Sequence, residues 1–327
     1  MNTQFRFLVL LFFVSIAQVS AQYTEVINAN RPGGSQGAFA VGRDVIQLET
    51  GIGFGKEEHR LLKTETNALS IDYSIRYGLL KEQLELSLMG EFQSNSVTQT
   101  QFEPAKKYKS ANFKSNTIGG KYLIYDPYVK IEAKGPNLYS WRANNKFQWE
   151  DLIPAISIYA GANIDFGEDN PFVPEDQISI SPKFVISTQN NWLGGWVFVT
   201  NIIVDRVTTE YPSYGYIITL THALNQNFSI FVENHGFKSD FYADQLFRGG
   251  AAALITKDLQ VDLSLTYGFK DTPSIFYGRV GLAYRFDLHA KDDYIEDMLP
   301  GSKKDEVKDK KKLRDQKLET GDENITE

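Results

Sequence analysis

The sequence predicts an all-β fold, a transmembrane antiparallel β-barrel of about 12 strands with a short N-terminal segment before it and a charged tail after it. Three observations carry this prediction. The chain starts with an export signal, and no later apolar run is long enough for a membrane-spanning helix. Apolar and polar residues alternate with a period of two over segments of about ten residues. Aromatic residues recur near the ends of these segments.

The first residues have the three parts of a secretory signal peptide. Arg6 supplies the positive charge, residues 7–15 the apolar stretch, and residues 19–21 the small-residue cleavage site. We therefore expect residues 1–21 to be removed and Gln22 to begin the mature protein. No cysteine follows the cleavage site, which argues against a lipid anchor. A protein with such a signal can end in the periplasm, in the outer membrane or in the medium.

Composition excludes several functions. The chain of 327 residues has a net charge of −7, whereas a nucleic-acid-binding protein would present a basic stripe. It contains no cysteine, so thiolate catalysis and Cys-based zinc sites are ruled out. No glycine-rich phosphate loop or nucleotide motif is present. We expect no nucleic-acid partner, no cofactor and no metal site.

The alternation is cleanest between Leu69 and Leu79. Ile71 and Ile75 belong to the apolar face there, while Asp72 belongs to the polar face. In a soluble β-sandwich the apolar face would point inward, and the strands would typically be five or six residues long. The greater length of these segments favours a barrel that crosses the outer membrane of a Gram-negative bacterium, with lipid against its apolar face.

The same pattern, followed along the chain, predicts a barrel domain over residues 44–287. An even number of strands is typical of bacterial barrels. The predicted strands lie near 44–56, 66–78, 83–94, 113–125, 152–166, 177–188, 195–206, 212–223, 227–238, 246–256, 259–270 and 274–287.

Connection lengths support this topology, because such barrels have short periplasmic turns and longer external loops. Residues 95–112 are predicted as an external loop. The exception is a periplasmic insertion at 126–151, too long for a turn, in which we expect a short helix over residues 141–149. Residues 22–43 are expected to form a periplasmic segment, for which a plug is one open role. Residues 288–327 are rich in charge and are expected to form a disordered periplasmic tail.

The alternation also predicts which charged residues face the lumen. They are Glu49, Asp72, Arg76, Glu85, Glu91, Glu233, Asp262, Arg279 and Arg285. Arg76 and Glu85 are similarly distant from the turn that joins their strands, so we expect an ion pair between them. Closure of the barrel would place Glu49 between Arg279 and Arg285 in height, as a charge ladder. Such charges can lock the closure or form a constriction that selects solutes, and both interpretations stay open.

One stretch of the mature chain resembles a known family. The residues that carry the resemblance are Asn30, Arg31, Pro32, Gly33, Ser35, Phe39, Val41, Gly42, Gln47, Glu49 and Gly51, with Phe231 to Glu233 and Gly281 to Phe286 later in the chain. They are similar to the outer-membrane transporter family named after MetA of phenol degradation. The resemblance implies transport of hydrophobic or aromatic compounds. The insertion at 126–151 and the charged tail depart from the family pattern.

We therefore expect a transporter or narrow channel for small, apolar or aromatic solutes. The alternative is a non-conducting barrel that scaffolds an outer-membrane complex through its periplasmic segments. We expect no enzyme, because none of the four histidines has an obvious neighbouring nucleophile. The expected partners are outer-membrane lipid, the assembly machinery that recognises an aromatic terminus such as residues 284–286, and other subunits of a complex.

Overall fold

The computed structural model describes residues 26–129, 138–140, 149–166, 170–173, 179–240 and 242–288. The predicted signal peptide, most of the predicted helix over 141–149 and the predicted charged tail lie outside the described residues. Of the insertion, the described part includes a short 3-10 helix, η1 (Trp149–Leu152). In the described ranges, no helix combines the length and the apolar character needed to cross a membrane.

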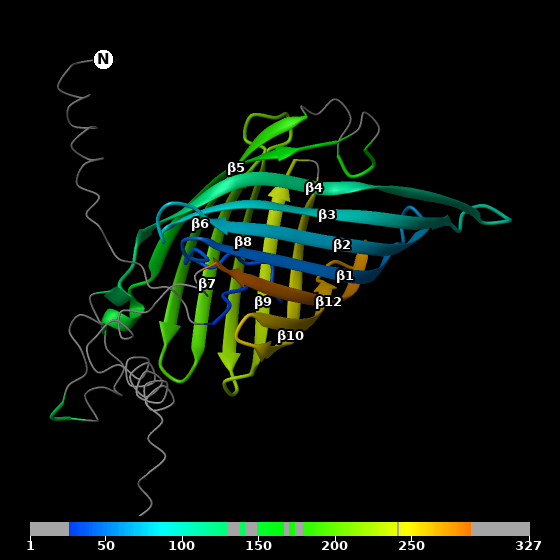
Figure 1. The fold of residues 1–327 in the computed structure, drawn as a ribbon. Coiled ribbons are helices and arrows are strands. Elements are labelled where there is room, and N and C mark those ends of the chain that lie inside the picture. Colours follow the sequence, from blue (N-terminus) through cyan, green and yellow to red (C-terminus); the bar gives the residue numbers. More distant parts are fainter. Residues whose placement is uncertain are drawn as a thin grey trace, which may run out of the picture. The chain divides into compact units, whose positions relative to one another are not determined.

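In the described part of the chain, twelve antiparallel strands close into a barrel, as predicted (Figure 1). Each strand pairs with its sequence neighbours, and β12 returns to pair with β1 from Val45 opposite Asp287 to Glu58 opposite Ser274. The strands are β1 (Val45–His59), β2 (Thr64–Gly78), β3 (Leu84–Gln99), β4 (Lys106–Tyr125), β5 (Ala155–Ile164), β6 (Ile180–Trp192), β7 (Trp196–Asp205), β8 (Ser213–Ala223), β9 (Phe228–Ser239), β10 (Ala243–Thr256), β11 (Leu259–Gly268) and β12 (Ser274–Asp287).

Alternation along each strand separates an apolar outer wall from a polar inner wall. On β1 the side chains of Ile52 and Phe54 are 49% and 66% exposed on the outside, whereas Gln47 and Glu49 are 0% and 4% exposed on the inside. Because a soluble protein would bury the apolar face, this reversed arrangement identifies lipid as the solvent of the outer wall.

Two strands are longer than the sequence predicts. The external loop predicted over 95–112 is wrong for most of that range, because β3 and β4 continue to pair until Gln99 meets Lys106. In Figure 1 these two ribbons extend well beyond their neighbours. This part is polar on both faces, with Lys106, Lys107 and Lys109 on β4, so it lacks the alternation that marks a strand in lipid.

Short connections occur at both ends of the barrel. We call the end where β1 begins and β12 ends the terminal rim, and the opposite end the distal rim. Short turns at 79–83, 193–195, 224–227 and 257–258 lie at the terminal rim, as expected on the periplasmic side, and the long connection from β4 to β5 is the exception there. The distal rim has short connections as well, at 60–63 and 240–242.

The entry into β1 depends on two glycines. Gly42 has a φ of 93°, a conformation that side chains disfavour. Its carbonyl oxygen lies so close to Gly78 that a Cβ on Gly78 would be 1.6 Å from it. The chain can therefore turn sharply from the lumen into the barrel wall at this point, which gives a structural role to a glycine of the N-terminal motif.

Candidate functional site

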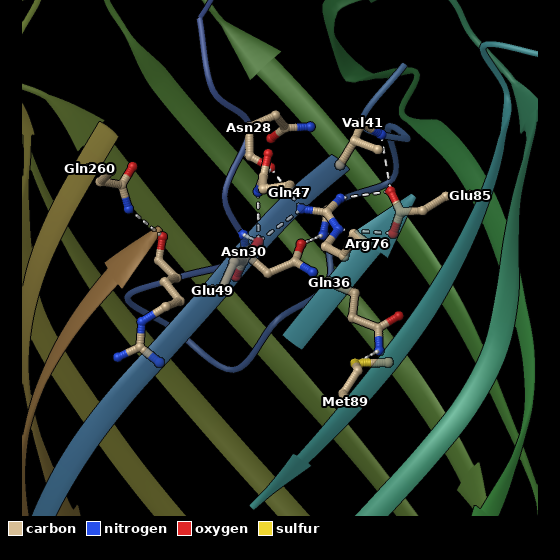
Figure 2. A network of polar contacts seen from close by, with 12 residues as sticks. Asn28, Asn30, Gln36, Val41, Gln47, Glu49, Arg76, Glu85, Met89 and Gln260 are labelled. Atoms are coloured by element: carbon tan, nitrogen blue, oxygen red, sulfur yellow. Dashed lines mark hydrogen bonds and ion pairs between the residues drawn. The ribbon is translucent and has the colours of Figure 1, made fainter. Parts of the chain in front are cut away.

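Residues 27–42, which we call the lumen segment, lie against the inner wall of the barrel. Figure 2 shows the segment crossing the lumen in front of the strands, with its Asn28, Asn30 and Gln36 beside side chains of the wall. Its backbone amides donate to wall side chains around the barrel: Asn30 to Glu49 (3.3 Å), Gly34 to Glu233 (2.9 Å), Gln36 to Asn201 (2.7 Å), Ala38 to Gln189 (3.0 Å) and Val41 to Glu85 (3.0 Å).

The carbonyl groups of the lumen segment are bound in the same way. Arg76 and Gln47 donate to the carbonyl oxygen of Asn28 (2.7 and 3.0 Å). Gln260 donates to the carbonyl of Arg31 (3.1 Å), and Asn201 donates to the carbonyl of Gln36 (2.8 Å). Lys121 donates to the carbonyls of Gly37 and Phe39 (3.0 and 2.8 Å). Irregular backbone is tolerated at membrane depth only where protein or water satisfies its polar groups. The wall side chains therefore replace the hydrogen bonds that a regular strand would make.

A buried charge cluster on β1 to β4 binds this segment near both of its ends. The guanidinium of Arg76 donates to both oxygens of Glu85 (2.9 and 2.8 Å) and to Glu49 (3.1 Å), and Lys121 lies 3.5 Å from Glu85. All four side chains are at most 4% exposed. The predicted pair of Arg76 and Glu85 is thus present, and it belongs to a larger cluster that includes backbone atoms of the lumen segment.

The charge ladder predicted at the seam between β1 and β12 has the predicted heights, but its three members do not pair with one another. Glu49 does lie between the two arginines in height, since it faces Ala283 in the register. However, Glu49 pairs with Arg76, Arg279 pairs with Glu91 on β3 (2.6 Å), and Arg285 pairs with Asp258 in the turn before β11 (2.7 Å). Two of these pairs join neighbouring strands, and the pair of Arg279 and Glu91 joins β12 to β3 past two strands. The heights of the residues alone do not predict such partners.

A second cluster surrounds Glu233 on β9. This carboxylate accepts hydrogen bonds from the amides of Gly34 and Ser35 and from the hydroxyl of Thr219 (2.8 Å), and it forms an ion pair with Arg248. The Glu233 side chain is fully buried. A buried polar group is stable only where hydrogen bonds or an ion pair replace its contacts with water, and these donors supply them.

Arg31 is the charged residue of the lumen segment. Its guanidinium makes two hydrogen bonds to Asp262 (3.0 and 3.1 Å) and an ion pair with Asp72. An arginine guanidinium keeps its proton in proteins, so the group is a permanent cation.

A cavity of about 210 Å³ lies between the lumen segment and the opposite wall. On its wall side, β7 to β10 contribute small or apolar residues and hydroxyls, and β6 and β11 contribute one glutamine each: Val197, Val199, Thr219, Thr221, Ser229, Phe231, Ala252, Gln189 and Gln260. The lumen segment contributes residues 27–33 to the other side. Apolar side chains and hydroxyls in one cavity suit a small, weakly polar molecule.

All nine charged residues predicted for the lumen lie on the inner wall, six of them buried and the other three, Asp72, Glu91 and Arg279, in ion pairs there. Sequence analysis missed Lys121 and Arg248, because glycines dilute the alternation on β4 and β10. Lys121 shares its parity with Leu123 and Thr117, so a strict count along β4 finds it. The uncharged wall ligands, such as Gln47 and Asn201, carry no signal of their own without the position of the lumen segment.

The described residues contain no group of three or more His, Asp or Glu side chains placed to hold a metal ion. The polar atoms of the lumen instead bind one another and the backbone of the lumen segment.

The family described as "Putative MetA-pathway of phenol degradation" matches residues 29–286 of the chain. Among solved structures, an outer membrane channel from Pseudomonas putida F1 is similar, with a TM-score of 0.50 and 9% identity over 80% of this chain and 100% of that one. The monoaromatic hydrocarbon channel CymD has a TM-score of 0.44 and 10% identity, over 76% of this chain and 90% of that one. No curated protein matches the chain.

Proposed function

The chain belongs to this family of outer-membrane β-barrels, and from that premise we propose that it is a plugged channel for small apolar or aromatic solutes. The outer wall contacts membrane lipid, and the polar inner wall surrounds a lumen that the segment of residues 27–42 narrows. In this proposal the barrel has no catalytic activity, and solutes leave chemically unchanged.

The observation that carries the proposal is the unequal grip on the lumen segment. Charged residues of β1 to β4 bind its backbone on one side, where Arg76 and Lys121 donate to its carbonyls. On the side of β7 to β10, Asn201 and Glu233 bind residues 34–36, and a cavity lies between residues 27–33 and the wall. A segment that served only to fill the barrel would pack against the wall along its whole length, whereas this arrangement leaves a place for a solute.

The size and the lining of the cavity suggest the class of solute. A cavity of about 150 Å³ lined by apolar residues is large enough for benzene. The cavity here, about 210 Å³, would hold one aromatic ring with a small substituent. Phe231 and Val199 supply apolar contacts, and the hydroxyl of Thr221 would accept or donate one hydrogen bond.

Single-channel conductance in a planar bilayer tests the pore. The purified, folded barrel would be compared with variants that lack residues 22–43 or residues 288–327, each first shown to be folded by circular dichroism. We expect rare, small openings in the full chain and stable, larger openings without residues 22–43. Silence of every folded form would contradict the open-pore version of the proposal.

Solute transport needs its own test, because apolar solutes carry no current. We expect deletion of the gene to slow growth on a monoaromatic carbon source supplied at low concentration, and the intact gene to restore it. Unchanged growth, together with a stoichiometric partner that co-purifies only when residues 288–327 are present, would favour the alternative of a scaffold in an outer-membrane complex.

A further inference from the structure

Four inward-facing residues form a straight row across the seam of the barrel. Gly51 on β1 is paired with Asp72 on β2 and with Gly281 on β12, and Gly281 is paired with Asp262 on β11. The row therefore reads aspartate, glycine, glycine, aspartate over four neighbouring strands. Because residues paired in this way point to the same side of a sheet, both carboxylates flank a position that has no side chain.

The two glycines create a slot that a single group occupies. A Cβ on Gly51 would lie 2.4 Å from Nη2 of Arg31, and a Cβ on Gly281 would lie 2.0 Å from the same atom. Any other residue at either position would displace the guanidinium. The slot is thus fitted to a flat group that lies directly against the backbone of β1 and β12.

The donors of Arg31 match the acceptors of the slot. Nε and Nη2 bind the two oxygens of Asp262 (3.0 and 3.1 Å), and Nη1 binds Asp72 on the other side. Such a planar fork reaches two carboxylates at once, whereas an ammonium group is a compact point charge that lacks this geometry. Asp72 is 20% exposed at its side chain, and its Oδ1 has no partner among the described residues.

The slot is next to the space in which we propose that solutes bind. Arg31, Pro32 and Gly33 line the cavity of about 210 Å³, together with Gln260, the inward neighbour of Asp262 on β11. A solute in the cavity therefore lies beside the group that occupies the slot. If Arg31 moved away, two carboxylates would face the lumen with no other cation in the row.

We propose that this row is a guanidinium-binding site of the lumen, occupied by Arg31 while the lumen segment is seated and open to small alkylguanidinium cations when Arg31 leaves. One consequence of the site rests on the proposed function: a bound alkylguanidinium cation would compete with Arg31 and so with the seated lumen segment that plugs the channel. The binding itself does not require that the barrel conducts.

Binding is tested on the full chain with Arg31→Ala, which empties the slot. Methylguanidinium chloride is the probe, methylammonium chloride is the matched control, and the thermal unfolding midpoint of the purified protein in detergent is the readout. We expect a saturable rise of the midpoint with methylguanidinium, because a ligand that binds only the folded state stabilises it. The same rise of the midpoint should require an about tenfold higher concentration of methylammonium.

Two further substitutions in the same background locate the binding. Asp262→Asn removes one acceptor, and Gly281→Ala fills the slot without changing any charge, so each should abolish the rise. Gly278→Ala is the control on the same strand, because its Cβ would have only ordinary contact with Leu265 at 3.5 Å. Equal rises with both cations, or a rise that survives Gly281→Ala, would overturn the proposal. If Arg31→Ala does not fold, Arg31→Lys replaces it, since lysine keeps the charge and loses the fork.

Conductance then separates this site from the proposed pore. In the wild-type chain, methylguanidinium should raise the frequency of openings and methylammonium should not. Silence of a folded protein whose Arg31→Ala variant still binds methylguanidinium would contradict the pore and leave the site intact. Openings that methylguanidinium does not alter, together with the absence of a midpoint shift, would contradict the site and leave the pore intact.

Discussion

The two sides of the lumen near the terminal rim differ in what they offer the segment between them. On β1 to β4, Glu49, Arg76, Glu85 and Lys121 form a buried charge cluster that binds the backbone of the segment. On β7 to β10 only Asn201 and Glu233 bind the segment, at residues 34–36, and beside these contacts a cavity lies between the segment and small, apolar and hydroxyl side chains of the wall. The difference indicates that one wall holds the segment and the other leaves room for a solute.

The charged wall is expensive to build, and this explains why it is fully paired. A buried charge that loses its partner costs far more than an exposed one, because water no longer solvates it. Arg76 neutralises two carboxylates that are 3% and 4% exposed, and it also binds a carbonyl of the segment. We therefore expect the holding wall to be much more sensitive to substitution than the cavity wall.

The largest effect should follow from Arg76→Met, which breaks the holding wall. It leaves Glu49 and Glu85 without their main partner, so we expect the free energy of unfolding to fall by about 3–5 kcal/mol. Chemical unfolding in lipid vesicles measures this loss. Lys56→Met is the control, because Lys56 is 56% exposed and pairs with an exposed Glu65, and such a pair contributes at most about 1 kcal/mol. Similar losses for both variants would show that the cluster has no special role.

A smaller effect should follow from Glu233→Gln, which weakens the grip on the middle of the segment. The neutral amide loses the ion pair with Arg248 and one charge-assisted acceptor for the amide of Gly34. At about 1.5–3 kcal/mol for such hydrogen bonds, we expect the open probability to rise about tenfold or more. Thr219→Val removes one hydroxyl that donates to the same carboxylate and should have a weaker effect. An unchanged open probability in Glu233→Gln would mean that this carboxylate does not hold the segment.

The cavity wall is tested by Ala252→Leu, which fills the space and leaves the charges intact. Ala252 is 6% exposed and faces the cavity. We expect uptake of a monoaromatic solute to fall about tenfold, since a few methyl groups in an apolar pocket change recognition by about 1–3 kcal/mol. Ala251→Leu is the matched control, because its neighbouring side chain points to the outer wall. A loss of equal size in the two variants would point to a general defect in assembly.

The two walls of the lumen also differ in how much of their structure the sequence alone predicts. Alternation in β1 and β2 predicts their positions and the inward direction of Asp72 and Arg76, because each side chain must match lipid or lumen. It does not predict partners, since these depend on the curvature of the closed barrel and on the path of the lumen segment. The cavity wall is even harder to predict, because nothing in the sequence distinguishes Val199 or Thr221 from other strand residues. A pair joined by one short turn, such as Arg76 and Glu85, is the exception.

For Glu49, the two interpretations of the seam charges, a lock of barrel closure and a constriction that selects solutes, predict different results of a substitution. The substitution of Glu49 should also have the smallest effect. Glu49→Gln keeps the size of the side chain and can still accept the hydrogen bond from the amide of Asn30, while Arg76 retains its two bonds to Glu85. We expect the cation-to-anion permeability ratio, measured from reversal potentials in a salt gradient, to fall by about twofold, because one carboxylate near the conducting path is lost. Arg76 gains no new partner, so the open probability should stay close to that of the wild type. A permeability ratio that does not change would remove the constriction and leave Glu49 as part of the lock on the holding wall.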